Sequence, residues 1–222
     1  MLDKVLFLGR KDCKYSKKLQ LYLKKKTKYL KVLNTNKKNQ KLKLDNYQYV
    51  FSFRSHIILK KKFIKKIKVA AINFHPGPPS YRGIGCVNYA LFDGVKNYGS
   101  TAHLIENEEL DSGKIIDFIE FKIKKKDNIK KLLDYTYQSM FIQAKKIINK
   151  LVVDECNLKI LIKKNNNLKW SNKIKSFDDL NKFYKINLNC DKKEFLKKIK
   201  ATNTDNFKPY IIFHGKKFLY ND

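Results

Sequence analysis

Two short segments carry the residue types of an acyl-transfer site. The first runs from Asn73 to Gly83 and places an amide and an imidazole, those of Asn73 and His75, two residues apart before a proline-rich turn. The second is a turn that holds a carboxylate, Asp111. An amide N–H can stabilise an oxyanion, and an imidazole beside a carboxylate can stabilise charge and move protons near neutral pH. These groups suffice for attack of an amine on an acyl carbonyl.

The residues around the amide and the imidazole predict that both side chains meet one ligand. Residues 68–75 read as a buried strand, in which alternate side chains point to the same face. Pro76 prevents continuation of a central strand, and Pro78 and Pro79 fix the backbone of the following loop. We therefore expect the two polar groups at a strand end, beside a rigid wall.

The reaction assigns a role to each polar residue. Asn73 is expected to donate an N–H to the oxyanion, and His75 to stabilise that charge and transfer protons. Asp111 is expected to orient His75 or an ordered water and to raise the pKa of the imidazole. Amine attack of this kind requires no covalent enzyme intermediate.

The two segments resemble the formyltransferase family that uses 10-formyltetrahydrofolate. The family motif is an Asn, one spacer and a His before a proline-containing loop that ends in Tyr-Arg-Gly. A second motif has an Asp, a small residue and a Gly, and this chain has both motifs in the same order, with a match over roughly residues 1–150. The residues between the motifs that also follow the family pattern are Ala90, Gly94, Gly99, Thr101 and His103.

The local form of the motif indicates a branch of this family. The sequence His-Pro-Gly-Pro-Pro, followed by Arg82-Gly83-Ile84-Gly85-Cys86, is most like members that formylate amino groups on nucleotide-linked sugars. It departs from the His-x-Ser-Leu-Leu-Pro form of the methionyl-tRNA and glycinamide ribonucleotide enzymes, which remain the alternatives. The resemblance implies 10-formyltetrahydrofolate as the formyl donor and a nucleotide-linked amino sugar as the acceptor. It implies a folate pocket formed by Ser52, Phe53, Arg54 and Asp111, and acceptor contacts from Pro78, Tyr81, Arg82 and Gly83.

The cysteines and histidines show no metal-binding pattern. The four cysteines include no CxxC pair, and the four histidines lack spacing such as HExxH, so we predict no metal. Cys86 reads either as a small apolar filler or as a reactive thiol beside the site. His103 reads either as a substrate contact or as a packed histidine. Phe53 could equally belong to an ordinary core.

The remaining sequence predicts an α/β, Rossmann-like domain. Alternating strands and helices favour a mainly parallel sheet with helices on both faces and ligands beyond the carboxyl ends of the strands. Residues 37–43 read as a polar loop. The expected strands are residues 5–8, 30–33, 49–54, 68–75, 98–105 and 114–123, and the expected helices are residues 15–26, 60–66 and 127–151.

The chain is expected to divide into a catalytic domain, residues 1–155, and a small appendage, residues 156–222. Within the appendage we expect a loop at 163–167, helices at 177–184 and 192–199, and a β-hairpin of 210–213 and 217–220 around His214-Gly215-Lys216. In the sugar enzymes that the chain resembles, a comparable hairpin serves dimerisation, so a homodimer is expected. Lys200 stands where that family usually has Arg.

The net charge of +30 favours a polyanionic partner, but the kind of basic residue weakens this argument. Nearly all the positive charge is Lys, as an AT-rich coding sequence would produce, and Arg occurs only at positions 10, 54 and 82. A polyanion-binding protein on a retained formyltransferase fold is the non-enzyme alternative, and a nucleic-acid partner stays open. Arg82 suits bidentate binding of phosphate or carboxylate, or a salt bridge that braces its own loop.

Hydropathy and cysteine usage predict the compartment. The apolar run near residue 5 is too short for a signal peptide or a membrane helix, and no other run approaches a spanning length. No disulfide framework is apparent. We therefore expect a cytoplasmic enzyme without a membrane partner.

Overall fold

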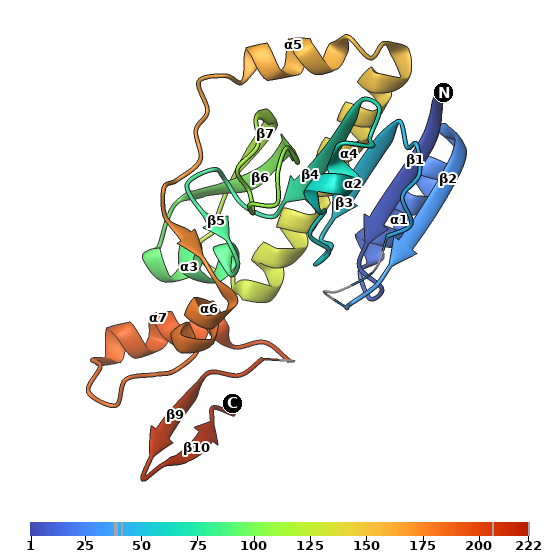
Figure 1. Ribbon diagram of the computed structural model, residues 1–222. Coiled ribbons are helices and arrows are strands. Elements are labelled where there is room, and N and C mark those ends of the chain that lie inside the picture. The colour runs from blue at the N-terminus through green and yellow to red at the C-terminus, as the bar shows by residue number, and fades with distance from the viewer. Residues whose placement is uncertain (38–39, 41, 206, 222) are drawn as a thin grey trace.

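The computed structural model describes residues 1–37, 40, 42–205 and 207–221, and it is built around a six-stranded sheet of order β2-β1-β3-β4-β6-β7 (Figure 1). Neighbouring strands from β2 to β4 are parallel, whereas β6 is antiparallel to both β4 and β7. The predicted α/β fold with a mainly parallel sheet is confirmed. The strands are β1 (Leu2–Gly9), β2 (Thr27–Asn34), β3 (Tyr49–Phe53), β4 (Ala70–His75), β6 (Asn97–Leu104) and β7 (Ile115–Lys122).

Both faces of the sheet are buried, as the apolar runs of its central strands require. Along β1, Val5 and Phe7 enter one core cluster, and Leu6 and Leu8 enter the other. Three helices cover the first face, and one short helix packs on the second. They are α1 (Lys14–Lys24), α4 (Ile129–Val153) and α5 (Asn157–Lys164) on the first face, and α2 (Lys61–Ile64) on the second.

Two helices were not expected from the sequence. The helix α3 (Cys86–Asp93) begins after Gly85, whose φ is +80°, and α5 begins after Cys156. The last turn of α5 occupies part of the predicted loop 163–167, so that prediction was wrong there. The predicted loop 37–43 lies partly outside the described residues. Within the part of the chain that is described, no helix is both long and apolar enough to cross a membrane.

The C-terminal elements follow the predicted order. The helix α6 (Phe177–Phe183) starts with a capping box between Ser176 and Asp179, and α7 (Lys192–Thr202) is capped by Asp191. The hairpin of β9 (Tyr210–Phe213) and β10 (Lys216–Leu219) turns at His214 and Gly215, whose φ values are +45° and +74°. Two consecutive positive φ values are those of a type I′ turn, which matches the twist of the strands. Figure 1 shows this hairpin standing away from the main sheet.

The chain between α5 and α6 returns to the loop that follows β4, residues 76–83, which we call the motif loop. We call residues 168–175 the strap. Its end, β8 (Ile174–Lys175), pairs in parallel with β5 (Arg82–Gly83), as Figure 1 shows. A Cβ on Gly83, whose φ is +92°, would lie 2.2 Å from the carbonyl oxygen of Lys175, so only glycine permits this crossing. The strap therefore joins the C-terminal part of the chain to the loop that follows β4.

The division of the chain at residue 155 stays a prediction. Just beyond it, Leu158 and Leu161 of α5 are buried in the main core. Further along, Ala201 of α7 is buried in a separate cluster with residues of α3 and the start of α4.

Candidate active site

The structure brings Asn73, His75 and Asp111 together. Asn73 and His75 lie two residues apart on β4, and both contact Asp111, which lies in the turn between β6 and β7. The Nδ1 atom of His75 lies 3.1 Å from Oδ2 of Asp111, and the Asn73 amide donates to Oδ1 at 3.4 Å. These contacts lie beside the carboxyl end of β4, where ligands of such sheets bind.

Asp111 is the centre of this cluster. Its backbone has a positive φ of +48°, which a short polar residue tolerates better than most. Besides the contacts to Asn73 and His75, its carboxylate accepts the backbone N–H of Gly83 at 3.1 Å and lies 3.3 Å from Nε2 of His103. Burial favours protonation, yet His75 and His103 hold the pKa of the Asp111 carboxyl well below its usual range. Asp111 is therefore ionised at neutral pH.

His75 faces an acceptor with each ring nitrogen. Its Nε2 lies 2.8 Å from the carbonyl oxygen of Tyr81, while Nδ1 faces Asp111. Burial would lower the pKa of His75, but the Asp111 carboxylate and then the Cys86 sulfur raise it well above the ordinary value. His75 is thus an imidazolium in a buried ion pair, with both N–H groups engaged.

His103 also belongs to the cluster. The sequence had left its role open. It lies opposite Asn73 in the antiparallel pairing of β4 and β6. Its Nδ1 lies 2.8 Å from the carbonyl oxygen of Leu104, and its Nε2 lies 3.1 Å from the amide nitrogen of Asn73. The signal for this role is the strand register, which becomes visible only once the two strands are paired.

Trp170, in the strap, contacts both histidines. Its ring centroid lies 5.4 Å from that of His75 and 5.0 Å from that of His103, with the indole nearly perpendicular to each imidazole. The indole N–H donates to the carbonyl oxygen of Gly113 at 2.8 Å. Sequence reasoning missed Trp170, although it is the single tryptophan of the chain.

The residues predicted to bind the acceptor form the walls of the cluster. Arg82 donates from Nε and Nη2 to the carbonyl oxygen of Leu110, at 3.0 and 2.8 Å, and pairs with Glu109 at 2.5 Å. Pro78 is buried, and the hydroxyl of Tyr81 donates to Asp93 at 2.7 Å. Gly83 holds Asp111 through its N–H. Arg82 therefore braces the motif loop against the Asp111 turn, and its contact with the acceptor stays a prediction.

The residues predicted to bind folate lie at the end of β3. Ser52 and Phe53 are buried, and Phe53 packs on Phe74 in the main core. Arg54 follows with a positive φ of +56°, and its guanidinium lies 3.7 Å from the ring centre of Tyr137. Among these three, Arg54 is the one that is partly exposed, and the contact of these residues with folate stays a prediction.

The thiol of Cys86 lies against His75. Its Sγ is 3.6 Å from Nε2 of His75 and donates to the carbonyl oxygens of Tyr81 and Gly83, both 3.2 Å away. Cys86 is buried at the first residue of α3. Within the described residues, no group of three or more His, Cys, Asp or Glu side chains is arranged to hold a metal ion.

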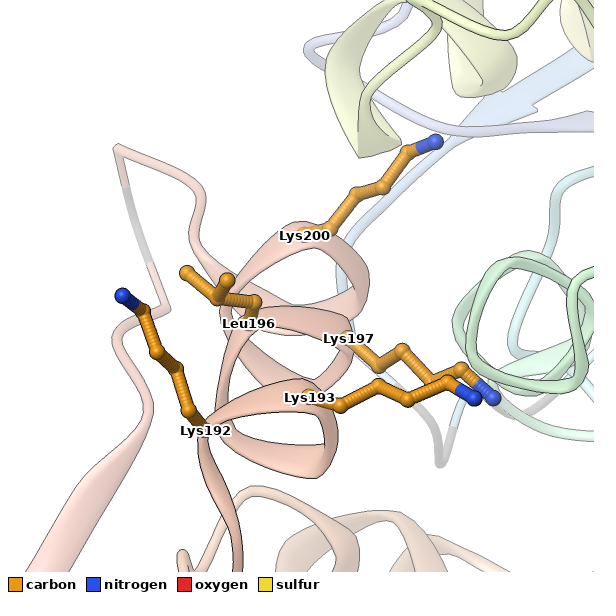
Figure 2. A pocket seen from close by; sticks show the side chains of 5 residues that line it. All are labelled: Lys192, Lys193, Leu196, Lys197 and Lys200. Carbon is orange, nitrogen blue, oxygen red and sulfur yellow. The ribbon is translucent and has the colours of Figure 1, made fainter.

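One hollow lies beside the site, and another lies elsewhere on the protein. One, of about 440 Å³, opens beside the catalytic cluster between the Asp111 turn and the strap, and Arg82, Ser112 and Trp170 are among its lining residues. The other, of about 490 Å³, lies on α7, far from the cluster in the sequence (Figure 2). Figure 2 shows Lys193 and Lys197 pointing to one side of α7 and Lys192 to another. Only the first hollow adjoins groups that could perform acyl transfer.

Comparison with known proteins identifies relatives of this site. The family described as "Formyl transferase" matches residues 23–142, more than half of the chain. The chain is 31% identical over 145 residues, 64% of its length, to the bifunctional polymyxin resistance protein ArnA of Wigglesworthia glossinidia brevipalpis. It is 30% identical over 98 residues, 44% of its length, to methionyl-tRNA formyltransferase of Finegoldia magna. The matches cover only 21% and 30% of these relatives, less than a third of each.

Solved structures share the fold over nearly the whole chain. A sugar N-formyltransferase from Shewanella sp FDAARGOS_354 superposes with a TM-score of 0.71 and 20% identity, covering 99% of this chain and 96% of that one. An N-formyltransferase from Helicobacter canadensis, solved with folinic acid and dTDP-3-aminofucose, superposes with a TM-score of 0.68 and 20% identity, covering 97% and 85%. At this level of identity the likeness establishes the fold.

Proposed function

The chain belongs to the formyl transferase family, and on this premise we propose that it transfers a formyl group from 10-formyltetrahydrofolate to the amine of a nucleotide-linked amino sugar. The observation that carries the proposal is the convergence of Asn73, His75 and Asp111 at the end of β4. It supplies an amide donor, a cationic imidazole and a carboxylate, the three groups that formyl transfer to an amine requires.

The proposed chemistry is a direct transfer. The acceptor nitrogen attacks the formyl carbon, a C–N bond forms, and the carbonyl oxygen becomes an oxyanion that the Asn73 amide and the His75 imidazolium stabilise. When the bond to the folate nitrogen breaks, His75 gives that nitrogen its Nε2 proton, which faces the Tyr81 carbonyl oxygen in the free protein, and takes one back from the acceptor nitrogen. Asp111 stays ionised and keeps the imidazole oriented throughout. Asn73 is partly exposed, whereas His75 and Asp111 are buried behind it, so the amide is the group that first meets the formyl oxygen.

Two observations support a sugar acceptor. The His-Pro-Gly-Pro-Pro form of the motif resembles the sugar branch, and the two described structural neighbours that cover nearly the whole chain are N-formyltransferases, one of them solved with an amino sugar nucleotide. The hollow between the Asp111 turn and the strap lies beside Asn73's cluster and is lined by polar groups suited to a sugar. Arg54, beyond β3, is proposed to contact the folate donor.

The C-terminal hairpin is proposed to form a dimer contact. Among its residues, Ile212, Phe213, Phe218 and Leu219 are all exposed, and apolar side chains grouped in this way mark an interaction surface. Light scattering of the protein should give the mass of a dimer, and Phe213→Asp with Phe218→Asp should give a monomer. A monomeric parent protein would contradict this contact.

A second acceptor, methionyl-tRNA, is favoured by one observation. The hollow on α7 is lined by Lys192, Lys193, Lys197 and Lys200 around Leu196 (Figure 2), and a group of lysines is the kind of surface that binds a phosphate backbone. The match to a methionyl-tRNA formyltransferase points the same way. The sugar acceptor is preferred because the motif loop has the sugar form and the α7 lysines lie on a different hollow from the catalytic cluster.

One experiment separates these acceptors. Purified protein is incubated with 10-formyltetrahydrofolate and either a panel of dTDP- and GDP-linked amino sugars or charged initiator tRNA, and the product is identified by mass. We expect one amino sugar nucleotide to gain a formyl group. Formylation of the charged tRNA with none of the sugars would overturn the sugar proposal, and His75→Gln protein serves as the blank.

A further inference from the structure

The strap is fastened to both loops that carry the catalytic cluster. The Trp170 indole donates to the carbonyl oxygen of Gly113, next to the Asp111 turn. The backbone N–H of Ser171 donates to the carbonyl oxygen of Pro79 at 2.9 Å, in the motif loop. A little further on, the N–H of Ile84 donates to the carbonyl oxygen of Lys175 at 2.8 Å. Trp170 therefore has a fixed position relative to both loops.

The fixed indole lies against two imidazoles at once. The interplanar angles are 84° with His75 and 83° with His103, the edge-to-face geometry that aromatic rings prefer. The titratable groups that face His75 from the packed elements are Asp111 and Cys86, and His103 contacts the same Asp111 carboxylate. The indole is thus placed to limit rotation of both rings about the Asp111 carboxylate.

We propose that Trp170 is a positioning residue, which holds the rings of His75 and His103 in the orientations that present both of them to Asp111. Only the kinetic consequence of this inference rests on the proposed function, because the ring orientations can be measured without any substrate. A residue that merely filled space would be replaceable by another apolar side chain of similar bulk. A positioning residue requires a rigid ring at this place.

The contact itself can be tested in the unaltered protein. Trp170 is the single tryptophan, so the indole emission reports only on this site. Protonated imidazoles quench indole emission, and we expect the emission to rise as pH is raised and His75 loses its proton. His75→Gln should remove this transition, and His214→Gln, a change at an exposed hairpin residue, should leave it in place. A transition that is identical in the parent protein and the His75→Gln variant would overturn the proposal.

The orientation is tested by NMR of the imidazole groups. The N–H proton that His75 shares with Asp111 should give a strongly downfield resonance, assigned by its loss in His75→Gln. We expect Trp170→Phe, which keeps a rigid ring, to retain this resonance, and Trp170→Leu to lose it and to change the His103 signals. Lys173→Ala, at an exposed strap residue outside the hollow, is the matched control and should behave like the parent. If Trp170→Leu keeps both sets of signals, the indole does not position the histidines.

The kinetic consequence distinguishes this inference from the proposed function. Displacing reacting groups by about 1 Å can lower turnover by about 10²-fold. We expect Trp170→Leu to lower kcat by about that factor and to move the pH at which kcat changes, while KM is little altered. Trp170→Phe should restore most of kcat. A parent protein that formylates no acceptor would refute the proposed function while the NMR result still decides the role of Trp170. Normal kcat and an unmoved pH profile in Trp170→Leu would overturn the inference.

Discussion

Nδ1 of His75 lies 3.1 Å from Oδ2 of Asp111, and both side chains are at least nine-tenths buried. The pKa of the imidazole is raised and that of the carboxyl is lowered, so each group stabilises the charged form of the other. Because the carboxylate also accepts an N–H from Gly83, the pair is fixed to the motif loop as well as to the sheet. We propose that this pair orients the imidazole for formyl transfer, and we expect it to make the stability of the protein depend on pH.

Loss of the carboxylate should nearly abolish catalysis. Asp111→Asn keeps the size of the side chain but removes the negative charge that holds the His75 imidazolium. We expect kcat to fall by about 10²–10⁴-fold, the usual contribution of a positioned acid–base group. Circular dichroism should show an intact fold. Asp178→Asn, in the exposed first turn of α6, is the matched control, and a near-normal kcat in Asp111→Asn would remove the carboxylate from the mechanism.

Loss of the Asn73 amide should destabilise the transition state of formyl transfer. Asn73→Ala removes the donor proposed for the oxyanion, and removal of one such donor typically lowers kcat by about 10²–10³-fold. Because the amide is expected to act mainly in the transition state, KM should change much less. Steady-state kinetics measure both, with Asn97→Ala, at the exposed first residue of β6, as the control. A large rise in KM with an unchanged kcat would contradict the assignment.

The buried ion pair should make stability depend on pH. A raised pKa for His75 in the folded protein means that its stabilisation is complete below the unfolded value of about 6.5 and is lost as pH rises through the folded pKa. The pKa of the Asp111 carboxyl is lowered, so the stabilisation that this carboxylate contributes is lost only at strongly acidic pH. At about pH 6, His75→Gln should reduce the free energy of unfolding by about 3–5 kcal/mol. Urea titrations should show this difference shrinking toward alkaline pH, and a constant difference would argue against the ion pair.

The thiol beside His75 should be dispensable for turnover. Cys86 donates to two carbonyl oxygens, and direct transfer to the amine leaves no bond for it to form. Cys86→Ala should therefore keep kcat within a few-fold of the parent, at a modest cost in stability. Mass spectrometry of enzyme mixed with the formyl donor alone should show no formylated protein. A formyl adduct that disappears in Cys86→Ala would instead indicate a thioester intermediate.

Gly83 should be required for the strap to dock. A methyl group at this position would meet the carbonyl oxygen of Lys175 at 2.2 Å, in addition to the strain of a positive φ. Gly94 has a similar φ of +71° but open space around it, so Gly94→Ala measures the strain alone, about 1–2 kcal/mol. Gly83→Ala should cost clearly more and should shift the Trp170 emission toward that of an exposed indole. Equal costs for the two variants would show that the strap is not held there.

The sheet and the shared face of Asn73 and His75 could be predicted because their signals are local. The apolar runs of β1 and β3 and the long amphipathic pattern of α4 are each contained in one segment of sequence. Asn73 and His75 share a strand, so their alternation already places both on one face. The loop after β4 was foreseen from its prolines.

The remainder of the site depends on contacts between distant segments. His103 joins the cluster through the register of β4 and β6, and Trp170 through the pairing of β8 with β5. The register of β4 against β6 cannot be read from either strand alone, and β5 and β8 are only two residues long each. The short helices α3 and α5 were not predicted from the sequence.

The strap also sets an order of events during synthesis. His75, His103 and Asp111 leave the ribosome well before Trp170, and contacts that close long loops form slowly compared with local ones. A nascent chain can therefore assemble its sheet and its Asp111 turn while the two imidazoles still lack their aromatic neighbour. Docking of the strap completes the pocket, which makes the onset of activity a late and non-local event in the folding of this protein.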